Sequence, residues 1–275
     1  MIRSRIHNPA RRYGFSLIEV AIVMIIVAIL LTTIGLPIAG QIEARRTEET
    51  RRALEEAKDA LLGFASANGR FPCPAFGNAL NNSAGQESFC AAASGTCVGS
   101  ETQVFQSHGN CSHFYDGFLP AATLGLSALD DQGFLRDAWS TQSNRIRYAV
   151  YDGTVGGFNF AFTSQTAMQS ATISNLGAAS KDYLQICNSG AGVTAASCGS
   201  TANTLTTKAP ILLFSLGRNA ATGGTGVDES KNTDGNIVYV SHTPVQGGAN
   251  EFDDILTWIP VSTFIKKMLD AGKLP

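Results

Sequence analysis

One long apolar segment near the N-terminus constrains this chain more than any other feature. From Leu17 to Ala39 the only ionisable side chain is Glu19. A helix of that length extends about 35 Å, and the hydrocarbon core of a bilayer is roughly 30 Å thick. Four arginines and no acidic residue precede the segment. We therefore predict a membrane-spanning helix over residues 15–40, with a cytoplasmic N-terminus and an exported C-terminal part.

The residues that open this segment differ from those of an ordinary secretory signal peptide. A signal peptide has its small-residue cleavage site after the apolar region, whereas here the small residue Gly14 lies before it. The stretch from Gly14 to Val20 reads Gly-Phe-Ser-Leu-Ile-Glu-Val and resembles the processing motif of type IV pilins and of type II secretion pseudopilins. The resemblance implies that prepilin peptidase cuts after Gly14, that Phe15 becomes the methylated N-terminus, and that residues 1–14 are a cytoplasmic leader.

Glu19 is an ionisable group within the apolar segment. Placing a charged side chain in lipid costs on the order of a few kcal/mol unless a partner neutralises it. A cut after Gly14 creates an α-amine at one end of the segment, and this amine can pair with the carboxylate of an adjacent subunit. The resemblance gives Glu19 this same role in assembly, the alignment of neighbouring helices in a filament. The alternative is a plain signal anchor, in which Glu19 lies at the headgroup level without a partner.

Beyond residue 40 the helical pattern becomes amphipathic. Charged residues occupy one side of residues 41–68, and apolar residues recur at three- and four-residue spacing on the other, so this half is expected to lie against a globular core. The helix is expected to end at Asn68-Gly69. Opposite charges at helical spacing, such as Glu48 and Arg52, form either a solvated face or pairs between subunits. The apolar positions are Ala53, Ala57, Ala60, Leu61 and Phe64.

The remaining residues, 69–275, predict one globular domain. Several segments have strand patterns, and no second long helix separates them, so we expect an antiparallel sheet packed on the long helix. This is an α+β fold, and the resemblance implies that it is pilin-like. An amphipathic helix over residues 261–274 is expected to dock on the domain. The predicted strands are residues 145–151, 209–216 and 236–242, with residues 158–162 as a fourth candidate.

The cysteines predict disulfides, because they are even in number and all follow the apolar segment of an exported chain. Cys187 and Cys198 flank a loop rich in Gly, Ala and Ser and are expected to pair. The other four, Cys73, Cys90, Cys97 and Cys111, allow three pairings that stay open. An alternative is a zinc site, although its spacing matches no standard zinc finger. That alternative set is Cys97, His108, Cys111 and His113.

Further segments extend the resemblance into the domain. Residues 137–139 (Asp-Ala-Trp), followed by residues 145–148, resemble the segment that enters the sheet in pseudopilins, with residues 140–144 inserted. Residues 215–217 (Ser-Leu-Gly) and 253–255 (Asp-Asp-Ile) resemble the two ends of the calcium loop in the major pseudopilin.

The resemblance implies that Asp253 and Asp254 hold calcium, which prefers such oxygen ligands. However, the 35 residues between Gly217 and Asp253 are far more than that compact loop contains. Asp228 and Asp234 from this insert could supply further ligands. The alternative is that Asp253 and Asp254 cap the following turn.

Charge and motifs argue against nucleic-acid binding and catalysis. The formal net charge is −2, and removing the four leader arginines lowers it to −6. Lys266-Lys267 is the only basic pair in the globular part, so no nucleic-acid partner is predicted. The chain has no nucleophile elbow, zinc-protease motif, P-loop or dinucleotide motif, and we do not expect an enzyme. Residues 74–117 form a long loop region, which the resemblance makes a candidate interaction surface.

Together these patterns predict a structural subunit of a bacterial type IV pilus or type II secretion pseudopilus, with calcium as its one possible cofactor. We expect it first in the inner membrane as a single-pass protein with a periplasmic domain, and then in the filament. The implied partners are prepilin peptidase, other pilin or pseudopilin subunits, an inner-membrane assembly platform and the lipid bilayer. The resemblance implies a minor subunit, because the abundant subunit of the family is usually smaller, and it argues against the tip subunit, which characteristically lacks the acid found here as Glu19. The alternative is a periplasmic binding or enzymatic domain on an uncleaved anchor.

Overall fold

The computed structural model describes residues 14, 16–77, 84–97, 99–127, 129–139, 141–224 and 226–274, without the side chains of residues 31–39 and 142. The chain divides into two compact units, Met1–Arg45 and Arg46–Pro275. The boundary lies inside the long helix α1, Leu17–Asn68. The amphipathic half of the helix, predicted over residues 41–68, thus belongs mostly to the second unit.

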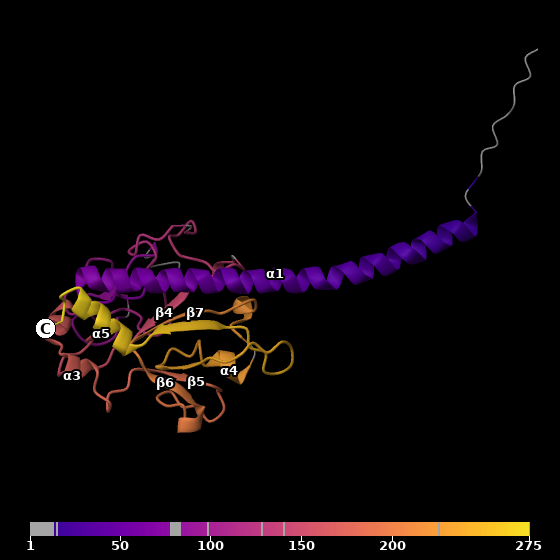
Figure 1. Ribbon diagram of the computed structural model, residues 1–275. Helices are drawn as coiled ribbons and strands as arrows, with labels where there is room; N and C mark the ends of the chain where they lie inside the picture. Colours follow the sequence, from indigo (N-terminus) through magenta and orange to yellow (C-terminus); the bar gives the residue numbers. More distant parts are fainter. Residues whose placement is uncertain are drawn as a thin grey trace, which may run out of the picture. The chain divides into compact units, whose positions relative to one another are not determined.

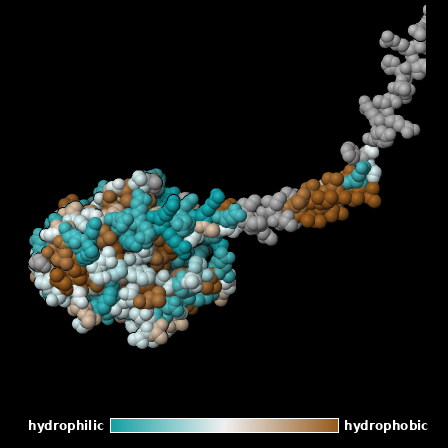
Figure 2. Space-filling view, viewed as in Figure 1, coloured by the Kyte–Doolittle hydropathy of each residue, from teal (hydrophilic) through white to brown (hydrophobic). Residues whose placement is uncertain are grey.

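In the first unit, α1 exposes a continuous apolar surface. Its large hydrophobic side chains between Leu17 and Leu30 are 43% to 90% exposed, and Figure 2 shows them in brown. An apolar surface of this extent marks a site of contact with lipid or protein. No helix in the described part of the chain has the length and apolarity needed to cross a membrane. The membrane pass over residues 15–40 therefore stays a prediction.

In the second unit, the C-terminal half of α1 is packed on the domain (Figure 1). Leu54, Ala57, Leu61 and Ala65 are at most 1% exposed, and their spacing places them on one face of the helix. The helix ends at Asn68, as predicted, because Gly69 takes a positive φ of 73° and its amide donates to Ala65 O.

The central sheet of the second unit has four antiparallel strands in the order β3-β4-β7-β9. Side chains alternate between its two faces. Tyr148 and Leu213 join the core shared with α1 and α5, whereas Leu212 and Phe214 join a second core on the opposite face. The sheet thus separates two apolar layers. Its elements are β3 Gly117–Phe118, β4 Arg147–Val150, β7 Ile211–Ser215 and β9 Ile255–Ile259, followed by α5 Val261–Asp270.

A second sheet, in the order β6-β5-β8, covers the face of the central sheet that is turned away from α1 (Figure 1). Strands β5 and β6 are antiparallel, but β5 and β8 are parallel, with Gln185 opposite Val238. The predicted α+β fold, with an antiparallel sheet packed on the long helix, is confirmed by the central sheet, and the parallel pair of β5 and β8 is an exception that was not predicted. Its strands are β5 Leu184–Cys187, β6 Thr204–Ala209 and β8 Val238–Val240.

The predicted strands at residues 145–151, 209–216 and 236–242 are confirmed as β4, β7 and β8, and the C-terminal helix as α5. The fourth candidate, residues 158–162, was wrong. There the chain turns, since Val155 and Phe158 form an isolated bridge and Phe160 has a φ of 52°. Strands β5, β6 and β9 were missed.

Short elements complete the second unit. Two pairs of residues form a small separate sheet, and short helices connect the strands of the two larger sheets. They are β1 Phe89–Cys90, β2 Glu101–Thr102, α2 Gln165–Ser170, α3 Ile173–Leu176, α4 Val227–Ser230, and the 3-10 helices η1 Gln142–Asn144, η2 Thr201–Asn203 and η3 Ala220–Thr222.

Candidate assembly and cation sites

The residues around the predicted cleavage junction cap the start of α1. Ser16 O accepts the amide of Val20 at 3.2 Å, which makes Ser16 the N-cap residue. The Glu19 amide donates to Ser16 Oγ at 3.4 Å, and the Ser16 amide donates to Glu19 Oε2 at 3.2 Å. This reciprocal pair is a capping box, with its glutamate at the third helical position. Sequence reasoning missed it, although the Ser-x-x-Glu spacing was its signal.

The cap fixes the direction of the Glu19 carboxylate. The side chain is exposed, yet its hydrogen bond with Ser16 turns it back toward the residues preceding the helix, where the positive end of the helix dipole favours a negative charge. Beside it, Val20, Val23 and Met24 line an apolar hollow of about 400 Å³. The carboxylate is thus placed at the junction that processing would open.

Gly14 is exposed, and a Cβ added to it would meet no atom of the described residues within 4 Å. Phe15, the predicted mature N-terminus, lies outside the described residues.

All six cysteines are in disulfides. Cys187 is bonded to Cys198, the pair expected from the sequence. The other bonds, left open by the sequence, join Cys73 to Cys111 and Cys90 to Cys97. The alternative zinc set was therefore wrong, because the sulfurs of Cys97 and Cys111 are both in disulfides.

The two histidines of that set have other roles. The ring of His113 stacks on Phe76 with centroids 3.7 Å apart. His108 Nδ1 accepts the amide of Asn110 at 3.0 Å.

The candidate interaction loop, residues 74–117, is fixed at its base. Arg70 and Glu87 form a buried ion pair with two bonds, Nη1 to Oε2 at 2.6 Å and Nη2 to Oε1 at 3.1 Å. Glu87 Oε2 also accepts the amide of Cys73 at 2.9 Å. Farther along, Val104 and Phe105 are 69% and 46% exposed. The loop therefore presents apolar side chains from a rigid base; its residues 78–83 and 98 lie outside the described ones.

The three segments of the domain that resemble pseudopilin segments, residues 137–139, 215–217 and 253–255, lie close together in the structure. Asp137 Oδ2 accepts hydrogen bonds from Ser215 Oγ and, at 3.1 Å, from Asn144 Nδ2. Asn144 Nδ2 also donates to Gly217 O. Gly217 in turn lies against Asp253, because a Cβ at Gly217 would be 2.1 Å from Asp253 Oδ1. The segment entering the sheet and the two ends of the predicted calcium loop thus form one continuous network.

Asp253 and Asp254 lie beside Glu229 of α4, with one ligand oxygen of each within 4.8 Å of the others. Glu229 and Asp254 are 1% and 5% exposed. Burial, followed by the charge of Glu229, raises the pKa of Asp253 to about 6. Burial also raises the pKa of Asp254 well above its usual value, although Asn232 Nδ2 donates to it at 2.7 Å.

These three carboxylates fit a hard divalent cation. Both carboxylate oxygens of Asp253 are buried and accept no hydrogen bond from the described residues, and the nearest cationic atom, Arg218 Nε, is 3.9 Å from Oδ2. A cation would neutralise the crowded charges that raise the pKa of Asp253. Calcium takes about six to eight oxygen ligands, and bidentate carboxylates can supply much of that number.

The insert contributes a carboxylate to the cluster, but it is neither Asp228 nor Asp234. Asp228 accepts from Asn250 Nδ2 at 2.7 Å and contacts His242 Nε2 at 3.0 Å, whereas Asp234 pairs with Lys231 at 3.6 Å. Glu229 is the residue of the insert that lies beside Asp253 and Asp254. The alternative role, capping of the following turn, is not observed, since β9 begins directly after Asp254.

Comparison with known proteins bears on the N-terminus alone. Residues 9–35 match the family model of the prokaryotic N-terminal methylation motif. No curated protein matches the chain, and no solved structure does. The matched residues include Gly14, the capping pair of Ser16 and Glu19, and the first turns of α1. The chain therefore carries the prepilin-type motif of type IV pilins and pseudopilins.

Proposed function

We propose that this protein is a structural subunit of a type IV pilus or type II secretion pseudopilus, cut after Gly14 and assembled through α1. One observation carries the proposal: the methylation motif at residues 9–35 coincides with a helix whose cap holds Glu19 at the junction. Cleavage there would free an α-amine next to the carboxylate of Glu19. In a filament, this amine and the carboxylate of a neighbouring copy would pair.

The two units suit two stages of this function. The exposed apolar half of α1 would hold the precursor in the inner membrane and would later be covered by the helices of neighbouring subunits. The second unit would lie in the periplasm, an oxidising compartment in which its three disulfides are stable. Prepilin peptidase, an assembly platform and other subunits are the partners that such a path requires.

We further propose that the protein acts through its surfaces and has no enzymatic activity. The carboxylates of Glu229, Asp253 and Asp254 would hold calcium, whose role would be to join α4 to the start of β9. The ion would supply charge neutralisation and no chemistry. The buried oxygens of Asp253, which accept no hydrogen bond within the geometric limits from the described residues and have only the distant Arg218 as a cationic neighbour, support this part of the proposal.

The processing step can be tested by expressing the full chain in bacteria with and without prepilin peptidase. We expect a mature protein that begins at Phe15 only when the peptidase is present. Gly14→Val should block the cut, and Gly40→Val, within α1, should not. Protein that still begins at Met1 beside an active peptidase, or that is cut after Ala39, would contradict the proposal and favour an uncleaved anchor.

A further inference from the structure

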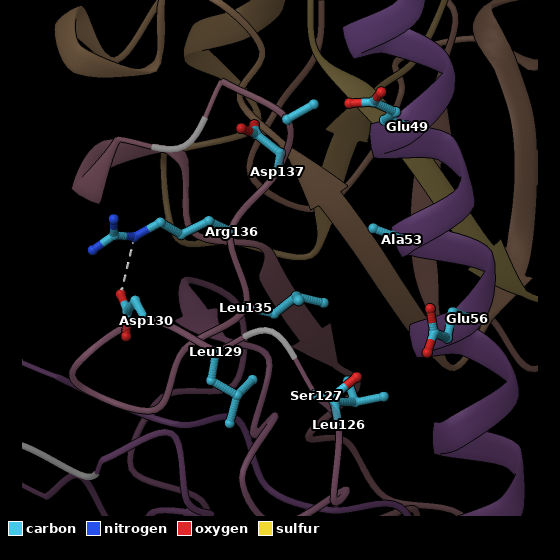
Figure 3. Close-up of a pocket in the computed structure, with 11 residues that line it drawn as sticks. Glu49, Ala53, Glu56, Leu126, Ser127, Leu129, Asp130, Leu135, Arg136 and Asp137 are labelled. Atoms are coloured by element: carbon cyan, nitrogen blue, oxygen red, sulfur yellow. Dashed lines mark hydrogen bonds and ion pairs between the residues drawn. The ribbon is translucent and has the colours of Figure 1, made fainter.

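Grooves lie on both sides of the buried face of α1 in the second unit. The larger has a volume of about 450 Å³, and Figure 3 shows Glu49 and Glu56 on the helix opposite a loop that carries Leu126 and Leu129. The smaller, about 250 Å³, lies between α1 and β9, the strand that leads into α5 (Figure 1). It is lined by Arg51, Leu54, Glu55, Ile255, Leu256 and Thr257. The far wall of the first groove is thus a loop, whereas that of the second is the edge of a sheet.

The main chain of β9 is paired along only one of its two edges. Strand β9 is the last strand of the central sheet and pairs with β7 alone. The amide of Tyr151 donates to Pro210 O, which shows that the even-numbered residues of β7 bond toward β4. Because main-chain groups point to alternate sides along a strand, the odd-numbered residues of β7 bond the odd-numbered residues of β9. The amides and carbonyls of Leu256 and Trp258 therefore point away from β7.

These four main-chain groups lie at a partly exposed edge. Among the described residues, no backbone group of a turn or loop bonds them. The residues from Leu256 to Trp258 are only half-buried, whereas all of β7 is buried. Beside them, the hydroxyl of Thr257 donates to Glu55 Oε1 at 3.1 Å. A strand edge with unpaired N–H and C=O groups is a template for the main chain of another strand.

Other outer strands of the two sheets are protected against such pairing, but β9 is not. Strand β3 has two residues and β8 has three. Strand β6 is longer, but register shifts interrupt its pairing with β5, and it carries Lys208, which bonds Asp182. Strand β9 keeps an unbroken register over five residues and contains no charged residue, proline or glycine. Short length, irregular register and charge are the usual protections of an edge, so β9 is the edge suited to pairing.

We propose that β9 binds an extended segment of a different exported protein by strand addition, so that the segment becomes a fifth strand of the central sheet. The main-chain groups of Leu256 and Trp258 would bond the segment. On one face its side chains would enter the smaller groove beside the exposed Arg51, which favours an acidic residue there. On the other face they would contact the partly buried side chains of Leu256 and Trp258, which favours apolar residues.

A second copy of this chain does not suit the same edge. Since the other outer strands are short or irregular, a second copy would have to offer its own β9. Two identical edges pair only antiparallel, about a two-fold axis, and such a contact closes a dimer instead of extending a filament. The choice of a different protein therefore rests on the proposed function.

The test uses the full chain in detergent and a defined probe, a synthetic eight-residue peptide of alternating valine and threonine in which one threonine is replaced by glutamate. The peptide should slow hydrogen exchange of the Leu256 and Trp258 amides about tenfold, the effect of about one hydrogen bond each. The matched control is the same peptide with methyl groups on the backbone amides that would face β9. It keeps the side chains and should give no protection. Protection by both peptides, or by neither, would overturn the inference.

A variant of the edge sharpens the test. Leu256→Pro removes a donor that faces away from β7, a position at which a strand tolerates proline, and should weaken peptide binding about tenfold. Leu256→Val keeps the amide and should bind nearly as the unaltered chain does. Equal binding by the two variants would refute strand addition. If Leu256→Pro does not fold, the methylated peptide decides the question by itself.

The class of partner is read by photo-crosslinking in cells that contain prepilin peptidase, with a photoreactive residue in place of Arg51 and a control in place of the exposed Leu205 on β6. A crosslink to a different protein is expected from position 51 only, and Leu256→Pro should abolish it. A crosslink to a second copy, or one that survives Leu256→Pro, would overturn the proposal. Peptide binding does not depend on processing, so an uncut chain would refute the proposed function without deciding whether β9 adds a strand.

Discussion

The two units of this chain differ in how their apolar side chains are covered. Between Leu17 and Leu30 the first unit exposes nearly all of its apolar surface. The second unit buries its apolar residues in layers on both faces of a sheet and adds three disulfides. A helix that cannot cover its own apolar surface must be covered by lipid or other chains. The apolar surface of the first unit is therefore suited to contacts with other molecules, whereas the second unit is stabilised by contacts within itself.

The acidic residues of the two units differ in the same way. Glu19 is exposed and held by the cap of its own helix. Glu229, Asp253 and Asp254 lie close together, and burial raises the pKa of Asp253 and of Asp254. The first carboxylate is open to a partner from another molecule, whereas the other three have partners from within the second unit.

The largest effect is expected where the second unit buries a charge pair. Arg70→Met leaves the carboxylate of Glu87 buried without its cation and should lower the free energy of unfolding by about 3–5 kcal/mol. Denaturant unfolding of the detergent-solubilised chain, followed by tryptophan fluorescence, measures it. Arg70→Met with Glu87→Leu should recover part of the loss. An unchanged midpoint in the single variant would show that the second unit does not depend on this pair.

The same substitution in the two halves of α1 tests the comparison directly. Leu61 is fully buried, and Leu61→Ala should cost about 2–5 kcal/mol because it leaves a cavity. Leu30 is 53% exposed, and Leu30→Ala should leave the unfolding of the domain unchanged. The same denaturant curves report both. Equal losses for the two variants would break the distinction between the units.

The carboxylate cluster predicts a stability that depends on pH and on calcium. Because the pKa of Asp253 is raised to about 6, the folded state binds more protons than the unfolded state between about pH 4 and pH 6. Without calcium, stability should therefore fall as the pH rises through that window, by about 2 kcal/mol. Calcium at pH 7 should restore it. Thermal unfolding in chelator and in calcium, across pH 4–8, measures both effects.

Asp253→Asn is the informative variant of this cluster. It removes the titrating group and one ligand, so the calcium-free protein should become more stable at pH 7 and should respond less to calcium. Asp234→Asn alters a carboxylate that pairs with Lys231 outside the cluster and is the matched control. A calcium response that survives Asp253→Asn and disappears in Asp234→Asn would mean that the site has been placed on the wrong residues.

The smallest effect is expected at the start of α1. Ser16→Ala removes the hydroxyl that caps Glu19 and should destabilise the first turn by about 1 kcal/mol, or about fivefold in local opening. Hydrogen exchange of the Glu19 and Val20 amides in detergent measures it. Ser16→Thr keeps a hydroxyl and should retain most of the protection. If Ser16→Ala also changed exchange in the central sheet, the two units would not be independent.

Much of the fold followed from local pattern. The end of α1 at Asn68, strands β4 and β7, and α5 were all predicted, because helical or alternating periodicity reports which face of an element is buried. Strand β6 was missed since its threonines are only partly buried and show no apolar alternation. The parallel pairing of β5 with β8 was also missed, because it joins segments about fifty residues apart. The periodicity of one strand does not show which other strand it pairs with.

The candidate sites also separate into features that follow from neighbouring residues and features that depend on tertiary contacts. By itself the sequence determined the apolar helix, the methylation motif at its start, the position of Glu19 and the pairing of Cys187 with Cys198, because each depends on residues close together in the chain. Only the tertiary structure decided that Glu229, and neither Asp228 nor Asp234, joins Asp253 and Asp254. It also decided that Glu49 and Glu56 border a groove. Such contacts between distant residues depend on how the layers pack, which no local spacing specifies.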